Sequence, residues 1–330
     1  MAGSVPGREF DLLVAGELNP DIVVSGDDVE PAFGQVERLV RRIALTVGSS
    51  SAITACGAAR LGLRVAFVGV VGDDPFGRWM LEALAARGVD VGACRVDSSL
   101  PTGASVILAR PDDRAILTST GTMAALTADD LPDGLLARAD HIHVGSLFLQ
   151  DRLRAGLAGV FGRAKALGLT TSFDPGWDPS GTWDGGISSI LEATVVVLPN
   201  REEARRITDG EGDLEAGQAL AARGPVVAMK LGPQGGLVVT RDAAARLDAP
   251  DVEIVDAIGA GDAFDAGFLA GWLDGRPPAD CLRLAVACGS LSVRAAGGTE
   301  GQPKRQEAEE LAGRLVARAV ALPSSFEARP

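Results

Sequence analysis

Seven short, mostly apolar runs are the feature of this 330-residue sequence that most constrains its fold. The runs are continuous rather than alternating, which is typical of strands buried on both faces in a parallel sheet. A sheet of this kind needs a covering layer on each side. The runs are DLLVAG (11–16), VAFVGVV (65–71), HIHVGS (141–146), TTSFDP (170–175), TVVVLP (194–199), VVAMKLG (226–232) and GLVVT (236–240).

Segments with apolar residues at helical spacing lie between these runs, and several end in glycine, a usual helix stop. The clearest segments are residues 50–62, 76–88, 152–168 and 213–224. Strand–helix alternation of this kind predicts an α/β fold with a three-layer α/β/α core around a mostly parallel sheet.

Two segments, residues 18–47 and 101–120, lack this helical spacing. Polar and apolar residues alternate between residues 105 and 109, which predicts a strand with one exposed face. We expect the two segments to pair into a small β-sheet that lies over the edge of the main sheet as a lid. Residues 1–330 then form a single domain, with the lid segments inserted in the core.

Charge and cysteine content narrow the classes of function. Lys and Arg number 31 against 44 Asp and Glu, a formal net charge of −13. A surface this acidic repels nucleic-acid phosphates and anionic lipid, which argues against a nucleic-acid or membrane partner. The four cysteines form no CxxC pair, and the first residues lack a basic region followed by a long apolar stretch. We therefore expect a cytoplasmic protein with reduced thiols.

A segment that begins at Asp256, DAIGAGDAFDAGFLAGWLDG, carries the clearest chemical signal. Gly259, Ala260 and Gly261 let the backbone approach a ligand closely, and they open a predicted helix whose first N–H groups make an anion site. Asp262 lies in that first turn. An acid there can simply complement the helix dipole. Beside an anion site, however, a carboxylate also makes sense as a base that takes a proton from a hydroxyl attacking a phosphate.

This segment resembles the C-terminal signature of the ribokinase (PfkB) family of carbohydrate kinases. Four other segments also resemble family motifs, and all five occur in the family's order. The five are GELNPD (16–21), ARLGLRVAFVGVVGDDPFGRWMLEALAARGVD (59–90), PNREE (199–203), KLGPQGG (230–236) and GAGDAFDAGF (259–268). The resemblance implies a ribokinase-like fold and an enzyme that moves the γ-phosphoryl group of ATP to a primary hydroxyl of a sugar or related polyol.

The resemblance also implies roles for individual residues. Asp262 would be the general base that deprotonates the acceptor hydroxyl. Residues 259–261 would donate backbone N–H groups to the transferring phosphoryl group. Asn200 and Glu203 would help to hold Mg²⁺ near the ATP phosphates through water, because Mg²⁺ keeps several waters and needs few protein ligands.

On the acceptor side, Asn19 and Asp21 match the family's contacts to sugar hydroxyls at the end of the first strand. Gly48 and Ser49 align with the Gly-Gly pair that relatives usually have before the first long helix. The resemblance therefore places these four residues at the substrate.

On the nucleotide side, Lys230, Gly232 and Gly235 would lie against ATP together with Gly261, and the glycines would give the adenosine room. Asp256 matches the Asp that heads the glycine motif. In many relatives this Asp and carbonyls of a later loop hold a potassium ion, so the resemblance also implies K⁺ as a possible cofactor.

Departures from the family pattern leave the acceptor open. Ile53 stands where relatives have an Asn that usually touches the sugar, and Ala257–Ile258 replace the usual Thr-Thr after Asp256. An apolar Ile53 and a tryptophan such as Trp177 would suit a nucleobase, so a nucleoside kinase of the same fold is an alternative. A non-catalytic sensor of sugar or nucleotide is another.

A sugar phosphate acceptor would need Lys or Arg facing the pocket, and Arg38, Arg41, Arg42 and Arg110 are the candidates. The small-molecule acceptor is the expected partner. Because lid-mediated dimers occur in relatives, a homodimer through the lid is possible as well.

Three other groups have mainly structural interpretations. His141 and His143 lie two residues apart and so share one face of a strand. They are expected to be structural or solvent-facing, and the alternative is that one of them borders the substrate near residues 145–146. The loop at 174–186, DPGWDPSGTWDGG, is either a turn-rich connection or a wall of the acceptor pocket. The acids of GDD at 72–74 are expected to cap the following helix.

Overall fold

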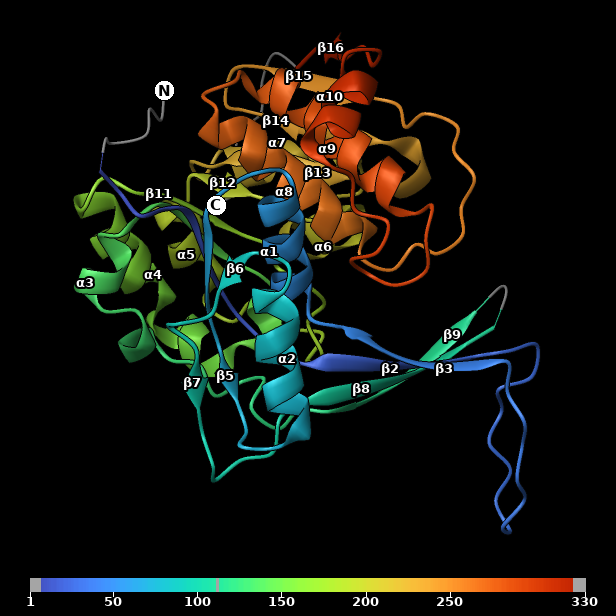
Figure 1. The fold of residues 1–330 in the computed structure, drawn as a ribbon. Helices are drawn as coiled ribbons and strands as arrows, with labels where there is room; N and C mark the ends of the chain where they lie inside the picture. Colours follow the sequence, from blue (N-terminus) through green and yellow to red (C-terminus); the bar gives the residue numbers. More distant parts are fainter. Residues whose placement is uncertain (1–6, 111–112, 323–330) are drawn as a thin grey trace.

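A ten-stranded β-sheet forms the centre of the computed structural model, which describes residues 7–110 and 113–322 (Figure 1). From one edge to the other, its strands are β16 (Arg318–Val320), β15 (Ala244–Leu247), β14 (Gly236–Val239), β13 (Val226–Lys230), β12 (Val196–Val197), β11 (Thr170–Phe173), β10 (Ala139–Val144), β1 (Phe10–Ala15), β4 (Val65–Val68) and β6 (Val89–Asp90). Neighbouring strands from β13 to β6 are parallel. Strands β14, β15 and β16 add antiparallel pairs at one edge.

Strand β1 shows why its residues form a continuous apolar run. Leu13 and Ala15 pack into the core on one side of the sheet. Leu12 and Val14 pack into the core on the other side. All four side chains are fully buried. A central parallel strand is covered on both faces, so neither face can carry polar side chains without a partner.

Helices cover both faces of the sheet and give the predicted three layers. One core contains residues of α3 (Asp133–Leu136), α4 (Asp151–Ala166), α5 (Ile187–Ala193), α6 (Arg201–Thr208) and α7 (Asp213–Ala221). The other core contains residues of α1 (Ser50–Arg60), α2 (Pro75–Ala85), α8 (Ala260–Leu273), α9 (Pro278–Ser292) and α10 (Arg305–Ala312). The four helices expected from apolar spacing correspond to α1, α2, α4 and α7.

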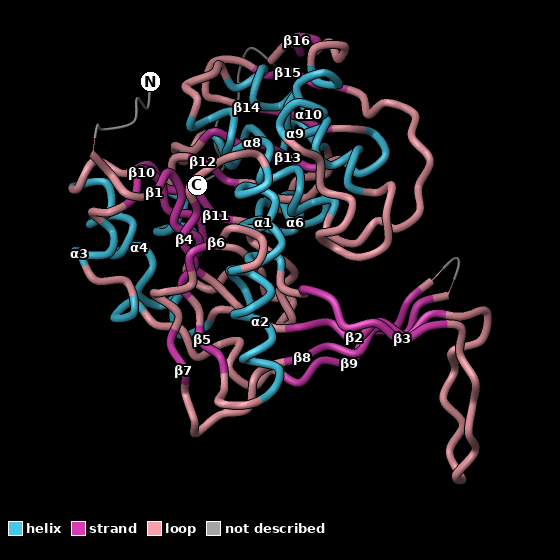
Figure 2. The backbone as a smooth tube through the Cα atoms, in the orientation of Figure 1, coloured by secondary structure: helices cyan, strands magenta, loops and turns pink. Residues whose placement is uncertain are grey.

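A separate four-stranded sheet is built from the two segments expected to be extended. Its strands, in spatial order, are β3 (Arg42–Val47), β2 (Pro20–Ser25), β8 (Ala104–Ala109) and β9 (Arg114–Ser119). Figures 1 and 2 show that this small sheet projects from the main body, with the segment between β2 and β3 reaching furthest. The predicted fold class is confirmed. A short parallel pair, β5 (Val70–Val71) and β7 (Arg95–Val96), continues beyond β4.

Within residues 7–110 and 113–322, none of the helices has the length and apolar character needed to cross a bilayer.

Candidate active site

Polar residues gather where the parallel strands end. Asn19 follows β1, Asp174 follows β11, Asn200 follows β12, and Lys230 ends β13. Since parallel strands have their carboxyl ends at the same edge, residues far apart in the sequence meet there. Asn200 forms a parallel bridge with Lys230, and the Lys230 Nζ donates to Asp174 over 2.6 Å.

The N-terminus of α8 faces this edge with free backbone donors. Gly259 caps the helix with φ of 77°, and a Cβ there would lie 2.6 Å from the Gly298 carbonyl oxygen, so only glycine fits. The Ala260 N–H donates to Ala257 O over 3.3 Å. In the described part of the chain, the N–H groups of residues 259, 261 and 262 have no acceptor. Free donors at a helix N-terminus are suited to an anion.

Asp262 lies in this first turn, opposite the N-terminus of α1. The Ser50 hydroxyl donates to Asp262 Oδ1 over 2.5 Å. Burial raises the pKa of Asp262 to about 7, and the charges of Asp174 and Glu17 act in the same direction. The Ser50 hydrogen bond and the Lys230 ammonium oppose this shift in the pKa. A carboxyl whose pKa is near neutrality can accept and release a proton at the pH of the cell.

Lys230 is the cation of a buried cluster next to Asp262. Its Nζ lies 2.6 Å from Asp174 and 3.0 Å from Asp265. Oxygens of Asp174, Asp262 and Asp265 all lie within 4.8 Å of one another, a spacing that would otherwise suit a metal ion. Burial alone would raise the pKa of Asp174, but the Lys230 charge lowers it. Burial alone would lower the pKa of Lys230, but the charges of Asp174 and Asp265 raise it. The pKa of Asp265 stays raised, because burial has the larger effect there. The ammonium therefore balances acids that could not all stay charged alone.

Asn200 and Glu203, predicted to hold Mg²⁺, form a capping box at the start of α6. The Asn200 N and Nδ2 donate to the two Glu203 oxygens over 2.7 and 2.6 Å, and the Glu203 N donates to Asn200 Oδ1 over 2.9 Å. Burial and the charge of Asp174 raise the pKa of Glu203 to about 8. Each Glu203 oxygen accepts one of these bonds and keeps a lone pair. A cation nearby would stabilise the ionised form of this carboxyl. The oxygen donors therefore fit Mg²⁺ held through water.

Asp21, which the sequence predicts to contact the acceptor, is the second residue of β2 in the small sheet. A Cβ on Gly48 would lie 2.3 Å from Asp21 Oδ1, so glycine at position 48 makes room for the carboxylate. Burial and the charge of Glu17 raise the pKa of Asp21 to about 6. Asn19 is almost fully buried, and its Oδ1 has no partner among the described residues. Contact of these two side chains with a sugar stays a prediction.

Ser49, the fourth predicted substrate residue, has a structural part in this arrangement. It caps α1 with φ of 71°, accepts from the Ala52 N over 3.0 Å and donates to the Glu17 carbonyl over 2.5 Å. Ser51 donates to the buried Glu17 carboxylate over 2.6 Å. These contacts hold the start of α1 against the end of β1.

A mostly apolar pocket of about 290 Å³ lies beside the N-terminal part of α8. Lys230, Gly232, Gly235 and Gly261, the four residues expected near ATP, all line it. A Cβ on Gly235 would lie 2.0 Å from the Leu247 carbonyl oxygen, so the turn between β13 and β14 also requires glycine. The Lys230 Nζ is directed at acids and away from this pocket, which leaves its aliphatic stem as the lining.

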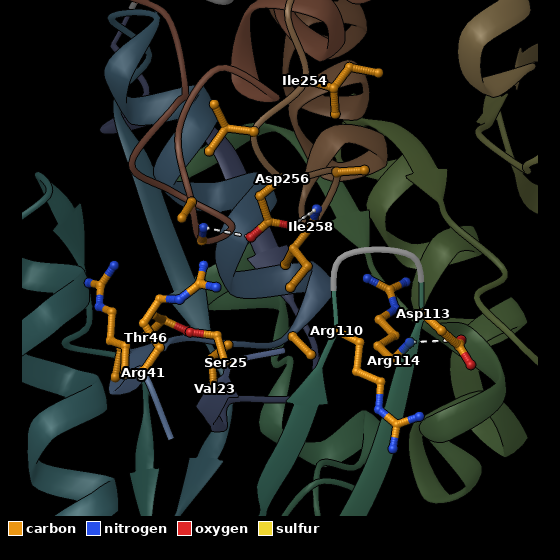
Figure 3. Close-up of a pocket in the computed structure, with 18 residues that line it drawn as sticks. Val23, Ser25, Arg41, Thr46, Arg110, Asp113, Arg114, Ile254, Asp256 and Ile258 are labelled. Carbon is orange, nitrogen blue, oxygen red and sulfur yellow. Dashed lines mark hydrogen bonds between the residues drawn. The ribbon is translucent and has the colours of Figure 1, made fainter. Parts of the chain in front are cut away.

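A second cavity, of about 710 Å³, separates the small sheet from the segment that leads to α8 (Figure 3). Asp256 lies on its wall, and its two oxygens accept from the N–H groups of Ile258 and Gly297, each over 2.9 Å. Asp256 thus ties the glycine segment to the loop after α9. The Val293 carbonyl accepts from the N–H groups of residues 255 and 256. Potassium at Asp256 stays a prediction.

The structure gives the remaining candidates mainly structural positions. His141 lies inside the sheet, bonded to Thr170 and Ser172 over 2.6 Å each, and His143 bonds Ser172 over 2.9 Å. Asp178 organises its own loop. Asp74 caps α2 by accepting from the Gly77 N, as expected from the sequence. These capping and loop contacts involve residues 178, 180, 183, 74 and 77.

Ile53 does not project freely into either cavity. It is buried, and a Cβ on Gly298 would lie 2.5 Å from its Cδ1. Its carbonyl accepts from the Gln302 Nε2 over 2.8 Å. The apolar residue at this position therefore packs against the loop that closes behind Gly259.

Sequence reasoning missed several residues of this site. Ser50 stands in a run of three serines at a helix start, and Asp265 follows Asp262 by one helical turn, so both had a local signal. Glu17 meets Ser51 only through the tertiary fold.

The sequence of this chain is similar to those of known carbohydrate kinases. The chain matches the model of the pfkB family carbohydrate kinases over residues 10–305. It is 30% identical to an ATP-dependent ribose-1-phosphate kinase from Halopiger xanaduensis, over 93% of this chain and 98% of that protein. It is 32% identical to a fructokinase from Klebsiella pneumoniae, over 88% of this chain and 98% of that protein.

Among solved structures, the chain is similar to Arabidopsis thaliana ribokinase complexed with ribose and ATP. The TM-score is 0.78 at 24% identity, over 92% of this chain and 98% of that chain. A likeness at this identity shows the fold, and the ribokinase-like fold expected from the sequence is confirmed.

Proposed function

Because the chain belongs to the pfkB family of carbohydrate kinases, we propose that it transfers the γ-phosphoryl group of ATP to a primary hydroxyl of a sugar or related polyol, with Asp262 as the general base. The observation that carries the proposal is the position of Asp262. Its carboxylate lies in the turn that presents free N–H donors, and neighbouring residues of the same segment line both spaces: Gly261 lines the pocket of about 290 Å³ and Ile258 the cavity of about 710 Å³.

The proposed step moves one proton and one phosphoryl group. The acceptor O–H gives its proton to Asp262, and its oxygen forms a bond to the γ-phosphorus while the bond to the β–γ bridging oxygen breaks, so that ADP leaves. The N–H groups of residues 259 and 261 stabilise the negative charge on the phosphoryl oxygens. Ser50 orients the carboxylate through its hydrogen bond.

We propose ATP as the phosphoryl donor and Mg²⁺ as the metal ion of this reaction. The relative from Halopiger xanaduensis is an ATP-dependent kinase, and the pocket of about 290 Å³ has an apolar lining suited to a nucleobase. Asn200 and Glu203 would hold Mg²⁺ through water. When bound, Mg²⁺ supplies positive charge that neutralises the phosphates.

The two similar enzymes act on different acceptors, a sugar phosphate and a neutral sugar by their names, so a panel is the appropriate test. ADP release from Mg–ATP is measured with sugars, polyols, sugar acids, sugar phosphates and nucleosides. The proposal expects turnover with a carbohydrate. Turnover with nucleosides alone would favour the nucleoside kinase, and binding of ATP without any turnover would favour the sensor.

The rate should depend on pH through Asp262. Since burial raises its pKa to about 7, the carboxyl is protonated and inactive as a base below that value. We expect kcat/KM to fall about tenfold for each pH unit below 7 and to level off above it. The pH profile of kcat/KM checks this, with Asp262→Asn as the control that lacks the acid limb. A profile that stays flat between pH 6 and 8 would contradict the assignment.

We also propose that the protein forms a homodimer through the outer face of the small sheet. Strand register places Ile43, Leu45 and Leu117 on the face opposite Asp21, and their exposed fractions are 66%, 39% and 64%. Apolar side chains gathered on one exposed sheet face are typical of a contact surface. Light scattering should give a dimer for the wild type and a monomer for Ile43→Asp/Leu117→Asp. A monomeric wild type would reject this surface.

A further inference from the structure

The cavity under the small sheet carries positive charge that the proposed function does not use. Four arginines line it, together with two acids, Asp113 and Asp256. The arginines are Arg41, Arg42, Arg110 and Arg114. Figure 3 shows Asp256 and Ile258 on one side of the cavity, with Arg110 and Arg114 across from them. A concentration of arginine is notable in a chain whose formal net charge is −13.

Strand register places two of these arginines in one row of the sheet. Arg42 pairs with Ser25, Ser25 with Ala109, and Ala109 with Arg114. Residues paired in this way project from the same face, and the two arginines are three strand spacings apart, about 14 Å between backbones. Their long side chains can therefore approach one ligand from opposite sides.

The same face also carries Asp21, the proposed contact to acceptor hydroxyls. Asp21 precedes Ser25 by four residues on β2, about 13 Å along the strand. Burial and Glu17 raise the pKa of Asp21, and the positive charge of Arg114 opposes them. The Arg114 guanidinium is therefore close enough to act on the acceptor end of the site.

Ion pairing separates the four arginines into two groups. Arg41 lies 2.5 Å from Asp27, and Arg110 lies 3.2 Å from Glu30. The guanidinium groups of Arg42 and Arg114 have no ion pair or hydrogen bond with residues 7–110 or 113–322. They are thus the two arginines of the cavity that form no salt bridge within the described part of the chain.

We propose that the acceptor carries an anionic group, a carboxylate or a phosphate, which Arg42 and Arg114 bind while the hydroxyl end lies at Asp21 and Asp262. Guanidinium groups donate two parallel N–H bonds to either anion, so both belong to one chemical class. The inference rests on the proposed function, which supplies the reaction. The arginines of the small sheet supply the argument that the acceptor is anionic.

Two matched pairs of ligands test the inference. Gluconate and glucitol differ by a carboxylate at one end, and fructose 6-phosphate and fructose differ by a phosphate. Titration calorimetry should give each anionic member a Kd at least about tenfold below that of its neutral partner. The first pair tests for a carboxylate and the second for a phosphate, so the pair that shows the preference identifies the anionic group that the site binds.

Arg42→Gln and Arg114→Gln should each raise the Kd of the anionic ligand about tenfold or more and leave that of the neutral ligand unchanged. Arg38→Gln is the matched control, since Arg38 lies on the same segment, pairs with Asp28 and does not line the cavity. Anionic and neutral ligands that bind equally, anionic ligands that do not bind, or arginine variants that bind as the wild type does would each overturn the inference.

ADP release, measured on the same preparations, separates this inference from the proposed function. If neutral acceptors are turned over and neither arginine variant alters that turnover, the kinase function is supported and the anionic acceptor is rejected. If anionic ligands bind through Arg42 and Arg114 but no ADP is released, the anion site is supported and the kinase function is rejected.

Discussion

Replacement of Asp262 by asparagine should lower kcat about 10²- to 10⁴-fold while ATP and acceptor still bind. The amide keeps the shape of the side chain and can still accept from Ser50, but it cannot take the proton of the acceptor hydroxyl. The free N–H groups at the start of α8 are unchanged, so the anion site is retained. ADP release gives kcat, and calorimetry gives the Kd for each ligand.

Asp280→Asn is the matched control for this result. Asp280 also lies in the first turn of a helix, α9, where it pairs with Arg283 on the surface. If Asp262 only complemented the helix dipole, the two variants would behave alike, with small losses of stability and normal turnover. A near-normal kcat for Asp262→Asn would therefore contradict the base assignment.

Replacement of Lys230 by methionine should reduce the free energy of unfolding by about 3–5 kcal/mol. The change removes the ammonium from between Asp174 and Asp265 and leaves two buried carboxyls without a cation. Lys230 also opposes the raised pKa of Asp262, so the acid limb of the pH profile should move above pH 7 in any folded variant. Urea denaturation measures the stability, and the pH profile measures the second effect.

Arg78→Met provides the comparison for Lys230→Met. Arg78 pairs with Asp73 over 3.0 Å, and both side chains are mostly exposed. Exposed pairs of this kind contribute at most about 1 kcal/mol, so this variant should unfold almost as the wild type does. Equal losses of stability in the two variants would show that the buried cluster does not depend on its lysine.

Much of the fold could be predicted because its signals are local. A strand such as β1 must bury both faces, which leaves a continuous apolar run in the sequence. Strands β15 and β16, near and at one edge of the sheet, were not predicted, because short strands with partly exposed residues lack that pattern. The extended character of the small sheet was visible, but its strand order was not, because register depends on contacts between residues 20–47 and 104–119.

The candidate site divides in the same way. The glycine segment before Asp262 was recognisable because a helix N-terminus free of side chains has a sequence signature. The pairing of Lys230 with Asp265 was not, since it joins β13 to α8 across the sheet. The sequence also placed Lys230 on the ATP side, whereas its ammonium is directed at carboxylates. Long-range electrostatics of this kind require the tertiary structure.

The most direct measurement of the central claim is the fate of the γ-phosphoryl group. ATP labelled with ³²P at the γ position is incubated with Mg²⁺, the wild-type protein and the acceptor that gives the fastest ADP release. We expect the label to move to the acceptor as an ester of its primary hydroxyl, and Asp262→Asn to slow this transfer at least about a hundredfold. Label that appears only as inorganic phosphate, or that stays in ATP with every acceptor, would contradict the claim.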